Sequence, residues 1–204
     1  AVRKGRGLPE GAEQEMKDAG VPDWYIESCK KIKYLFPKAH AVAYVMMAFR
    51  IAWFKVHRPL AFYAAYFSIR AKAFDEAFMC RGMEEVKKKM RAIQAKDKEA
   101  TAVEQDMLTT LEVCYEFYLR GFRFEQIDLY QSDAKNFRID EANKSLIPPF
   151  MSVAGLGETA AISLAEQREG RSFISSEEVA AACPKVSKTH IELLKAAGAF
   201  GNLP

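Results

Sequence analysis

A short segment beginning at Phe36 combines a cation, an imidazole and two aromatic rings. Pro37 interrupts any preceding helix, so Lys38 is expected near the N-terminus of the next one, where free backbone N–H groups favour an anion. Tyr44 follows His40 by four residues, which places both on one helix face. Lys38 and His40 can then converge on a phosphate, with the ring of Tyr44 beside a base or sugar. The same pattern also fits a solvated lysine and a histidine that caps the helix.

A second segment, Val153–Thr159, contains two glycines around one leucine ahead of an alanine-rich stretch. In such a tight turn the backbone N–H groups can face a phosphate without side-chain obstruction. Lys185-Val186-Ser187-Lys188-Thr189 resembles a degenerate second copy, in which Ser187 can cap the following helix. Two such hairpins predict a helix-hairpin-helix pair that binds the backbone of duplex DNA without reading its sequence. The alternative is a pair of helical hairpins whose glycines only allow close packing.

The familiar catalytic motifs do not occur in this sequence. It contains no Asp-x-Asp pair of the kind that holds two Mg²⁺ ions, and no Walker A, HExxH or GxSxG motif. The four cysteines include no CxxC pair and are expected to be reduced thiols in the core. We therefore predict neither a catalytic residue nor a metal site.

The charge of the chain is unevenly distributed. The net charge is only +3, but no acidic residue occurs between Glu27 and Asp75. A concentrated basic zone suggests a polyanionic partner such as nucleic acid, nucleotide or acidic lipid. The basic residues of this window are Lys30, Lys31, Lys33, Lys38, Arg50, Lys55, Arg58, Arg70 and Lys72.

The elements that must position these segments are mostly helices. Periodicity and breakers predict helices over residues 8–20, 22–35, 40–57, 82–99 and 102–119, with another starting at Pro59. The helix over 40–57 is apolar on every side, so we expect it to be central and buried. Because Arg50 and Lys55 interrupt it, we do not expect it to span a membrane. Aromatic residues of the next helix, Phe62, Tyr63, Tyr66 and Phe67, are expected in the core.

Between Phe122 and Leu146, alternating apolar residues predict two or three short strands, including a hairpin. Ile147-Pro148-Pro149 then marks a boundary, and short helices separated by glycine and proline follow. We therefore predict a mainly α fold with a small β-hairpin region, and a domain boundary between residues 145 and 146.

Together these residues resemble the C-terminal part of PolC-type DNA polymerase III alpha subunits of low-GC Gram-positive bacteria. The similarity runs nearly from end to end and is most specific between Val21 and His57. The matching segments are Arg3–Leu8, Val21–Tyr34, Phe36–His40, Phe54–His57, Ile127–Tyr130, and Ser145–Phe150 followed by Gly155-Leu156-Gly157.

The resemblance implies that residues 1–145 are a partial fingers domain and that residues 146–204 are a tandem helix-hairpin-helix domain. It also implies a cytoplasmic protein that binds duplex DNA and an incoming dNTP. The palm with its catalytic carboxylates and Mg²⁺, the thumb, and the peptide that binds the sliding clamp are expected outside this chain, which alone should be inactive and bind no cofactor.

Residue by residue, the resemblance implies two sets of contacts. The nucleotide contacts are Phe36, Lys38, His40, Tyr44 and Arg50; the DNA contacts are Gly155, Leu156, Gly157, Thr159, Ser187, Lys188 and Thr189. Two other functions stay open: a non-catalytic DNA-binding module with a helical scaffold, and a helical protein-interaction domain.

Overall fold

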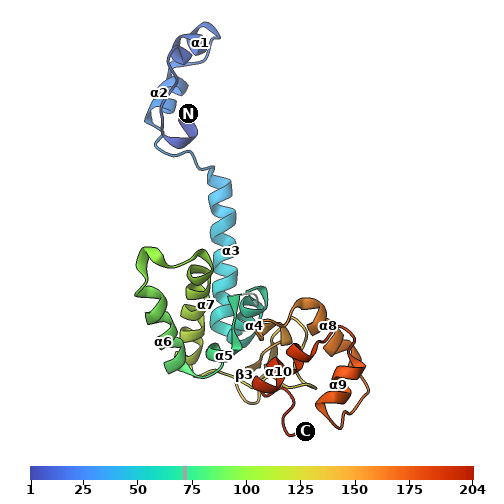
Figure 1. The fold of residues 1–204 in the computed structure, drawn as a ribbon. Coiled ribbons are helices and arrows are strands. Elements are labelled where there is room, and N and C mark those ends of the chain that lie inside the picture. The colour runs from blue at the N-terminus through green and yellow to red at the C-terminus, as the bar shows by residue number, and fades with distance from the viewer. Residues whose placement is uncertain (71–72) are drawn as a thin grey trace. The chain divides into compact units, whose positions relative to one another are not determined.

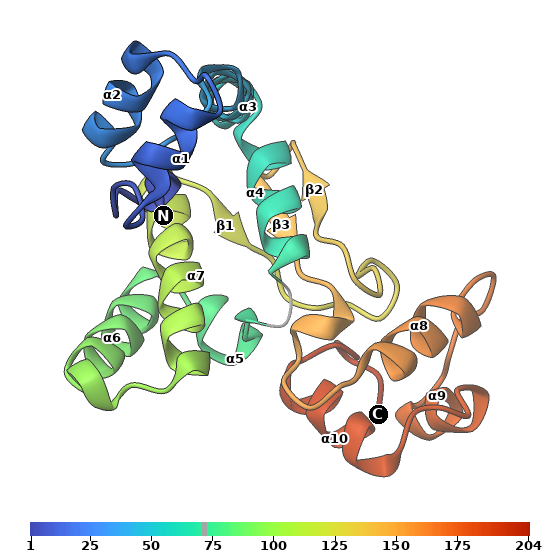
Figure 2. The same ribbon diagram turned by 90° about the horizontal axis from the view of Figure 1, so that it is seen from above.

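The computed structural model describes residues 1–70 and 73–204. The chain is mainly helical with one small sheet, which confirms the predicted fold class (Figures 1 and 2). It divides into two compact units, Ala1–Trp53 and Phe54–Pro204, and each is described by itself. This division does not test the boundary predicted between residues 145 and 146.

The first unit contains η1 (Val2–Lys4), α1 (Ala12–Asp18), α2 (Asp23–Lys31) and most of α3 (Lys38–His57). Extended Pro22 precedes α2, as expected from a proline that begins a helix. The Lys30 ammonium lies 2.9 Å from carboxylate oxygens of both Glu13 and Glu27, and so links α1 to α2.

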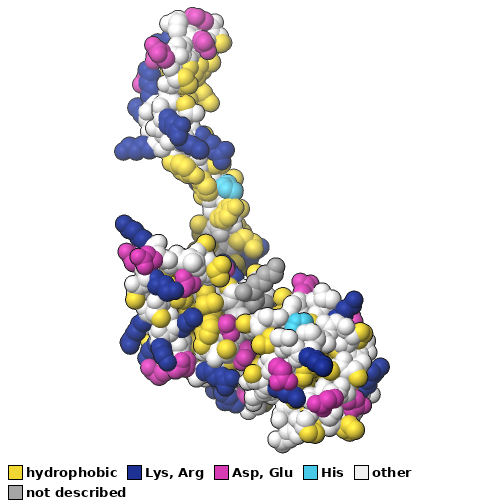
Figure 3. All heavy atoms as spheres, viewed as in Figure 1, with side chains coloured by type: hydrophobic (Ala, Val, Ile, Leu, Met, Phe, Trp, Pro, Cys, Tyr) yellow, Lys and Arg dark blue, Asp and Glu magenta, His cyan; other side chains and the backbone are white. Residues whose placement is uncertain are grey.

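The helix α3 differs from its prediction. It begins at Lys38 and none of its residues is buried. Apolar side chains cover the surface over this helix (Figure 3). The expectation of a buried helix was wrong for this chain, since an apolar helix is buried only where other elements surround it. By length and composition α3 is also able to cross a membrane, but those two properties do not distinguish a membrane span from a packed helix.

The second unit begins with an aromatic core. It includes α4 (Pro59–Ile69), α5 (Glu76–Met79), α6 (Met83–Gln94), η3 (Asp97–Glu99) and α7 (Ala102–Leu119). Tyr63 and Phe67 of α4 are fully buried and pack against Phe117 of α7, with ring centroids 5.1 and 5.8 Å away. Phe62 and Tyr66 pack at the edge of this core, so the aromatic set of α4 is confirmed as core.

A hydrogen-bonded network connects the C-terminal end of α3 to this core. Glu116 of α7 accepts bonds of 2.7 Å from both Lys55 and the Tyr63 hydroxyl. Burial alone would raise the Glu116 pKa, but these bonds outweigh burial and lower it. Burial and the bond to this carboxylate raise the pKa of Tyr63 to about 12. Arg120 donates to the Lys55 carbonyl over 3.0 Å and completes the network.

Three short strands form the sheet: β1 (Arg123–Phe124), β2 (Arg138–Asp140) and β3 (Ser145–Ile147). The central strand β3 is parallel to β1 and antiparallel to β2 (Figure 2). The β2–β3 pair confirms the predicted hairpin.

Ile127 and Leu129 are buried, but they do not lie in a strand as their alternation suggested. The Asp128 carboxylate accepts bonds from the N–H groups of Tyr130 and Gln131, and this turn competes with strand pairing.

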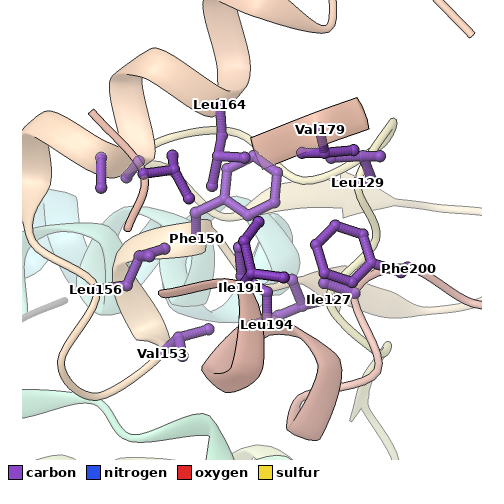
Figure 4. Close-up of a cluster of buried hydrophobic side chains, with 14 of the residues drawn as sticks. Ile127, Leu129, Phe150, Val153, Leu156, Leu164, Val179, Ile191, Leu194 and Phe200 are labelled. Atoms are coloured by element: carbon purple, nitrogen blue, oxygen red, sulfur yellow. The ribbon is translucent and has the colours of Figure 1, made fainter. Parts of the chain in front are cut away.

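The last helices surround a second core. After η4 (Phe150–Ser152) come α8 (Glu158–Gln167), α9 (Ser176–Ala182) and α10 (Lys188–Ala196). Leu164, Val179 and Leu194, one from each helix, meet around Phe150 (Figure 4). Ile127 and Leu129 join this core from the preceding segment. This packing fixes the two turns that precede α8 and α10.

Candidate nucleic-acid interfaces

Three of the predicted nucleotide-binding side chains lie together at the start of α3. The ring of His40 is 4.7 Å from that of Phe36 and 4.5 Å from that of Tyr44, measured between centroids. The i, i+4 spacing of His40 and Tyr44 therefore produces the expected contact. All three rings are exposed, so they can receive a flat ligand.

Lys38 and Arg50 are not part of this ring contact. Lys38 is the first residue of α3 and is exposed, but it lies two residues before His40 and so points to a different side of the helix. Arg50 lies about 18 Å further along the helix axis and contacts the Met47 sulfur at 3.9 Å. Convergence of Lys38 and His40 on one phosphate stays a prediction.

The first hairpin turn leaves several backbone N–H groups without a backbone acceptor in the described part of the chain. The N–H of Leu156 donates to the Val153 carbonyl over 3.0 Å, and Leu156 is buried in the second core. Gly155 has a φ of +89°, whereas Gly157 has a φ of −57° and precedes α8. Among the described residues, the N–H groups of Gly155, Gly157 and Thr159 donate to no backbone acceptor. The turn borders an open groove of about 580 Å³, so a ligand can reach it.

The second hairpin repeats the first with residue numbers shifted by 30. The N–H of Val186 donates to the Cys183 carbonyl over 2.9 Å, as Leu156 does to Val153. α8 begins at Glu158 and α10 at Lys188. The buried residues also correspond, in the pairs Leu156 and Val186, Ala161 and Ile191, and Leu164 and Leu194.

Ser187 occupies the position of Gly157, and its hydroxyl accepts a 3.2 Å bond from the N–H of His190. The imidazole of His190 accepts in return from the Ser187 N–H. This capping box confirms the predicted cap. Lys185, Lys188 and Thr189 are exposed on the same turn, and the two lysines form no ion pair within the described part of the chain.

One residue beside the first hairpin escaped the sequence analysis. Lys135 forms an ion pair with Glu158, the first residue of α8. The loop that carries Lys135 is fixed to the hairpin, because the N–H groups of Phe150 and Met151 donate to the carbonyls of Asp133 and Ala134. Only the tertiary fold brings Lys135 to this turn, so no local pattern could have identified it.

Within residues 1–70 and 73–204, no three His, Cys, Asp or Glu side chains are gathered so that they could hold a metal ion. The described residues therefore offer no group of oxygen ligands of the kind that binds Mg²⁺. The four cysteines are free thiols, and burial raises the pKa of Cys114 and Cys183.

Comparisons with known proteins match part of the chain to a motif family and the whole chain to segments of longer proteins. Residues 121–204 match the helix-hairpin-helix motif family, and this match includes the sheet ahead of the two hairpins. Over its whole length the chain is 51% identical to a PolC-type DNA polymerase III of Caldanaerobacter subterraneus subsp. tengcongensis. It is 50% identical to PolC-type DNA polymerase III proteins of Bacillus subtilis and Thermotoga maritima. Both matches again cover the whole chain. The chain spans 14% of the length of the first two relatives and 15% of the third.

Proposed function

We propose that this chain is the fingers and duplex-binding part of a replicative DNA polymerase of the PolC type. The observation that carries the proposal is the identity of about half of all residues to such polymerases along the whole chain. The match of the last 84 residues to a helix-hairpin-helix family supports the DNA-binding half of the proposal.

In this proposal the start of α3 binds the incoming nucleotide. Lys38 and His40 neutralise and orient the triphosphate, while Phe36 and Tyr44 contact the base or sugar. Arg50 lies further along the helix. It contacts phosphates only if the bound nucleotide, or the DNA strand beside it, extends along α3. The contribution of this chain to nucleotidyl transfer is electrostatic and positional. Carboxylates of a palm domain in a longer polymerase would hold the Mg²⁺ ions.

The two hairpins hold the product duplex. The N–H groups of Gly155, Gly157 and Thr159 donate to phosphate oxygens at the first turn. Ser187, Lys188 and Thr189 contact a second phosphate at the other turn. Corresponding positions of the two hairpins differ by 30 residues, and two similar turns suit the two strands of a duplex. The side chain of Leu156 is buried in the second core and supports the turn from inside, and its contact with DNA stays a prediction.

The exposed apolar surface of α3 has a simple role in a longer polymerase. Palm and thumb domains are the partners that would cover it, since an apolar helix is stable in water only when other elements pack on it. The sliding clamp would bind the longer protein elsewhere, and the enzyme would work in the bacterial cytoplasm.

The salt dependence of duplex binding tests the DNA-binding half of the proposal. We expect the chain to bind two short duplexes of unrelated sequence with equal affinity, since backbone contacts carry no sequence information. A plot of the logarithm of the binding constant against the logarithm of the salt concentration should have a slope of about −2 or steeper. Each neutralised phosphate contributes about −0.9 to this slope, and each hairpin contacts at least one phosphate.

Fluorescence anisotropy with labelled duplexes measures both quantities. Strong preference for one sequence would contradict backbone recognition. Absence of binding at low salt would favour a helical protein-interaction domain.

A further inference from the structure

The N-terminal segment is attached to the loop between α2 and α3. The N–H of Leu35 donates to the Arg3 carbonyl over 3.1 Å. Gly5 has a φ of +69° and lies so close to Lys33 that an added Cβ would stand 2.0 Å from the Lys33 carbonyl oxygen. The glycine is therefore required for this close approach, which places the basic run Arg3–Arg6 beside Lys33.

Six exposed cations lie in the N-terminal segment, in the segment around the end of α2 and at the start of α3. None of them forms an ion pair with a carboxylate in the described part of the chain, whereas nearby Lys30 is neutralised by Glu13 and Glu27. Figure 3 shows Lys and Arg side chains gathered where α2 gives way to α3. The six cations, which we call the basic cluster, are Arg3, Lys4, Arg6, Lys31, Lys33 and Lys38.

A row of aromatic rings adjoins the basic cluster. The ring of Tyr34 stacks on that of Phe36 with centroids 6.2 Å apart and an angle of 18° between the planes. Phe36 in turn contacts His40, and His40 contacts Tyr44. Tyr34 and Tyr44 are 67% and 65% exposed, so both ends of the row are open to a ligand.

We propose that an unpaired DNA strand, such as the template ahead of the duplex, binds to the side chains of the basic cluster and the aromatic row that the nucleotide does not use: Arg3, Lys4, Arg6, Lys31, Lys33 and Tyr34. Six cations and four rings exceed what one nucleotide with one base and about four negative charges can use. The bases of a duplex stack on each other, so exposed rings suit a single strand, whose bases are free to stack on protein. The choice of DNA as the polyanion rests on the proposed function.

The experiment compares the binding of labelled oligo(dT) to the full chain and to Arg3→Ala/Lys4→Ala/Arg6→Ala. We expect the affinity to fall about tenfold. The slope of log affinity against log salt concentration should become shallower by about 2, since each of the three lost contacts to a single strand contributes about 0.7. Lys88→Ala/Arg91→Ala/Lys98→Ala removes the same charge from exposed positions near and on α6, and should leave the affinity unchanged.

The aromatic row is tested separately. Tyr34→Ala should weaken oligo(dT) binding about fivefold or more, whereas Tyr34→Phe should not, because every base stacks on a ring. Equal affinity of Tyr34→Ala and the unaltered chain would overturn the stacking part of the proposal.

Two further measurements separate the possible failures. If the triple Arg3/Lys4/Arg6 variant binds oligo(dT) normally but no longer binds phosphatidylserine vesicles, the surface binds membrane and the proposal is wrong. The hairpins are tested through Gly157→Val: loss of its duplex affinity together with unchanged oligo(dT) binding by the triple variant would refute this inference and leave the proposed function intact.

Discussion

The chain carrying Gly157→Val is expected to remain folded and to bind duplex DNA about 10- to 100-fold more weakly, the loss that follows when one or two hydrogen bonds to a charged group are removed. Nothing in the described structure lies within 4 Å of a Cβ at Gly157, and its φ of −57° suits any residue. The valine side chain would instead project into the space where the phosphate approaches the backbone N–H groups.

Gly155 is a poorer choice for this test, although the sequence marks both glycines. Its φ of +89° strains any other residue, and a Cβ there would lie 3.1 Å from Leu193. A loss of binding in Gly155→Val would therefore mix misfolding with lost contacts. Ala142→Val, in the exposed turn between β2 and β3, is the matched control for added bulk. Unchanged duplex affinity in a folded Gly157→Val protein would show that the hairpin does not bind phosphate.

The second large effect is expected in a whole polymerase. This polymerase is a chimera in which the chain replaces the matching segment of the Bacillus subtilis relative. The exchange is feasible because the two share 50% identity over the whole chain. Lys38→Ala in that chimera should raise the KM of all four dNTPs about 10- to 100-fold, because a charge-assisted contact to the shared triphosphate is lost.

Steady-state incorporation kinetics on primed templates measure this effect. The duplex affinity should not change, since the hairpins are untouched, and Lys98→Ala is a control for the loss of one exposed lysine. An unchanged KM would make Lys38 a solvated residue at a helix start. A rise in KM for one dNTP alone would place Lys38 near the base.

Local patterns predicted the features that depend on neighbouring residues. The helix over 102–119 was predicted at the bounds of α7, and Thr101 caps it with a box completed by Glu104. The Ser187 cap and the contact of His40 with Tyr44 also follow from spacings of three and four residues.

Features that depend on distant parts of the chain were not predicted. The attachment of Arg3 to Leu35 joins segments 32 residues apart, so the basic zone visible in the sequence contains Lys33 but not Arg3, Lys4 and Arg6. The apolar composition of α3 predicts burial, but composition shows only that the helix needs packing partners. It does not show which segments supply them. The predicted nucleotide and DNA contacts stay predictions, since they require ligands.

The most direct test of the central claim is primer extension by the unaltered chimera. If this chain is the fingers and duplex-binding part of a PolC-type polymerase, the chimera should incorporate nucleotides on primed DNA at a rate close to that of the Bacillus subtilis parent. A folded chimera that binds primed DNA but incorporates no nucleotide would contradict the claim and favour a non-catalytic DNA-binding module.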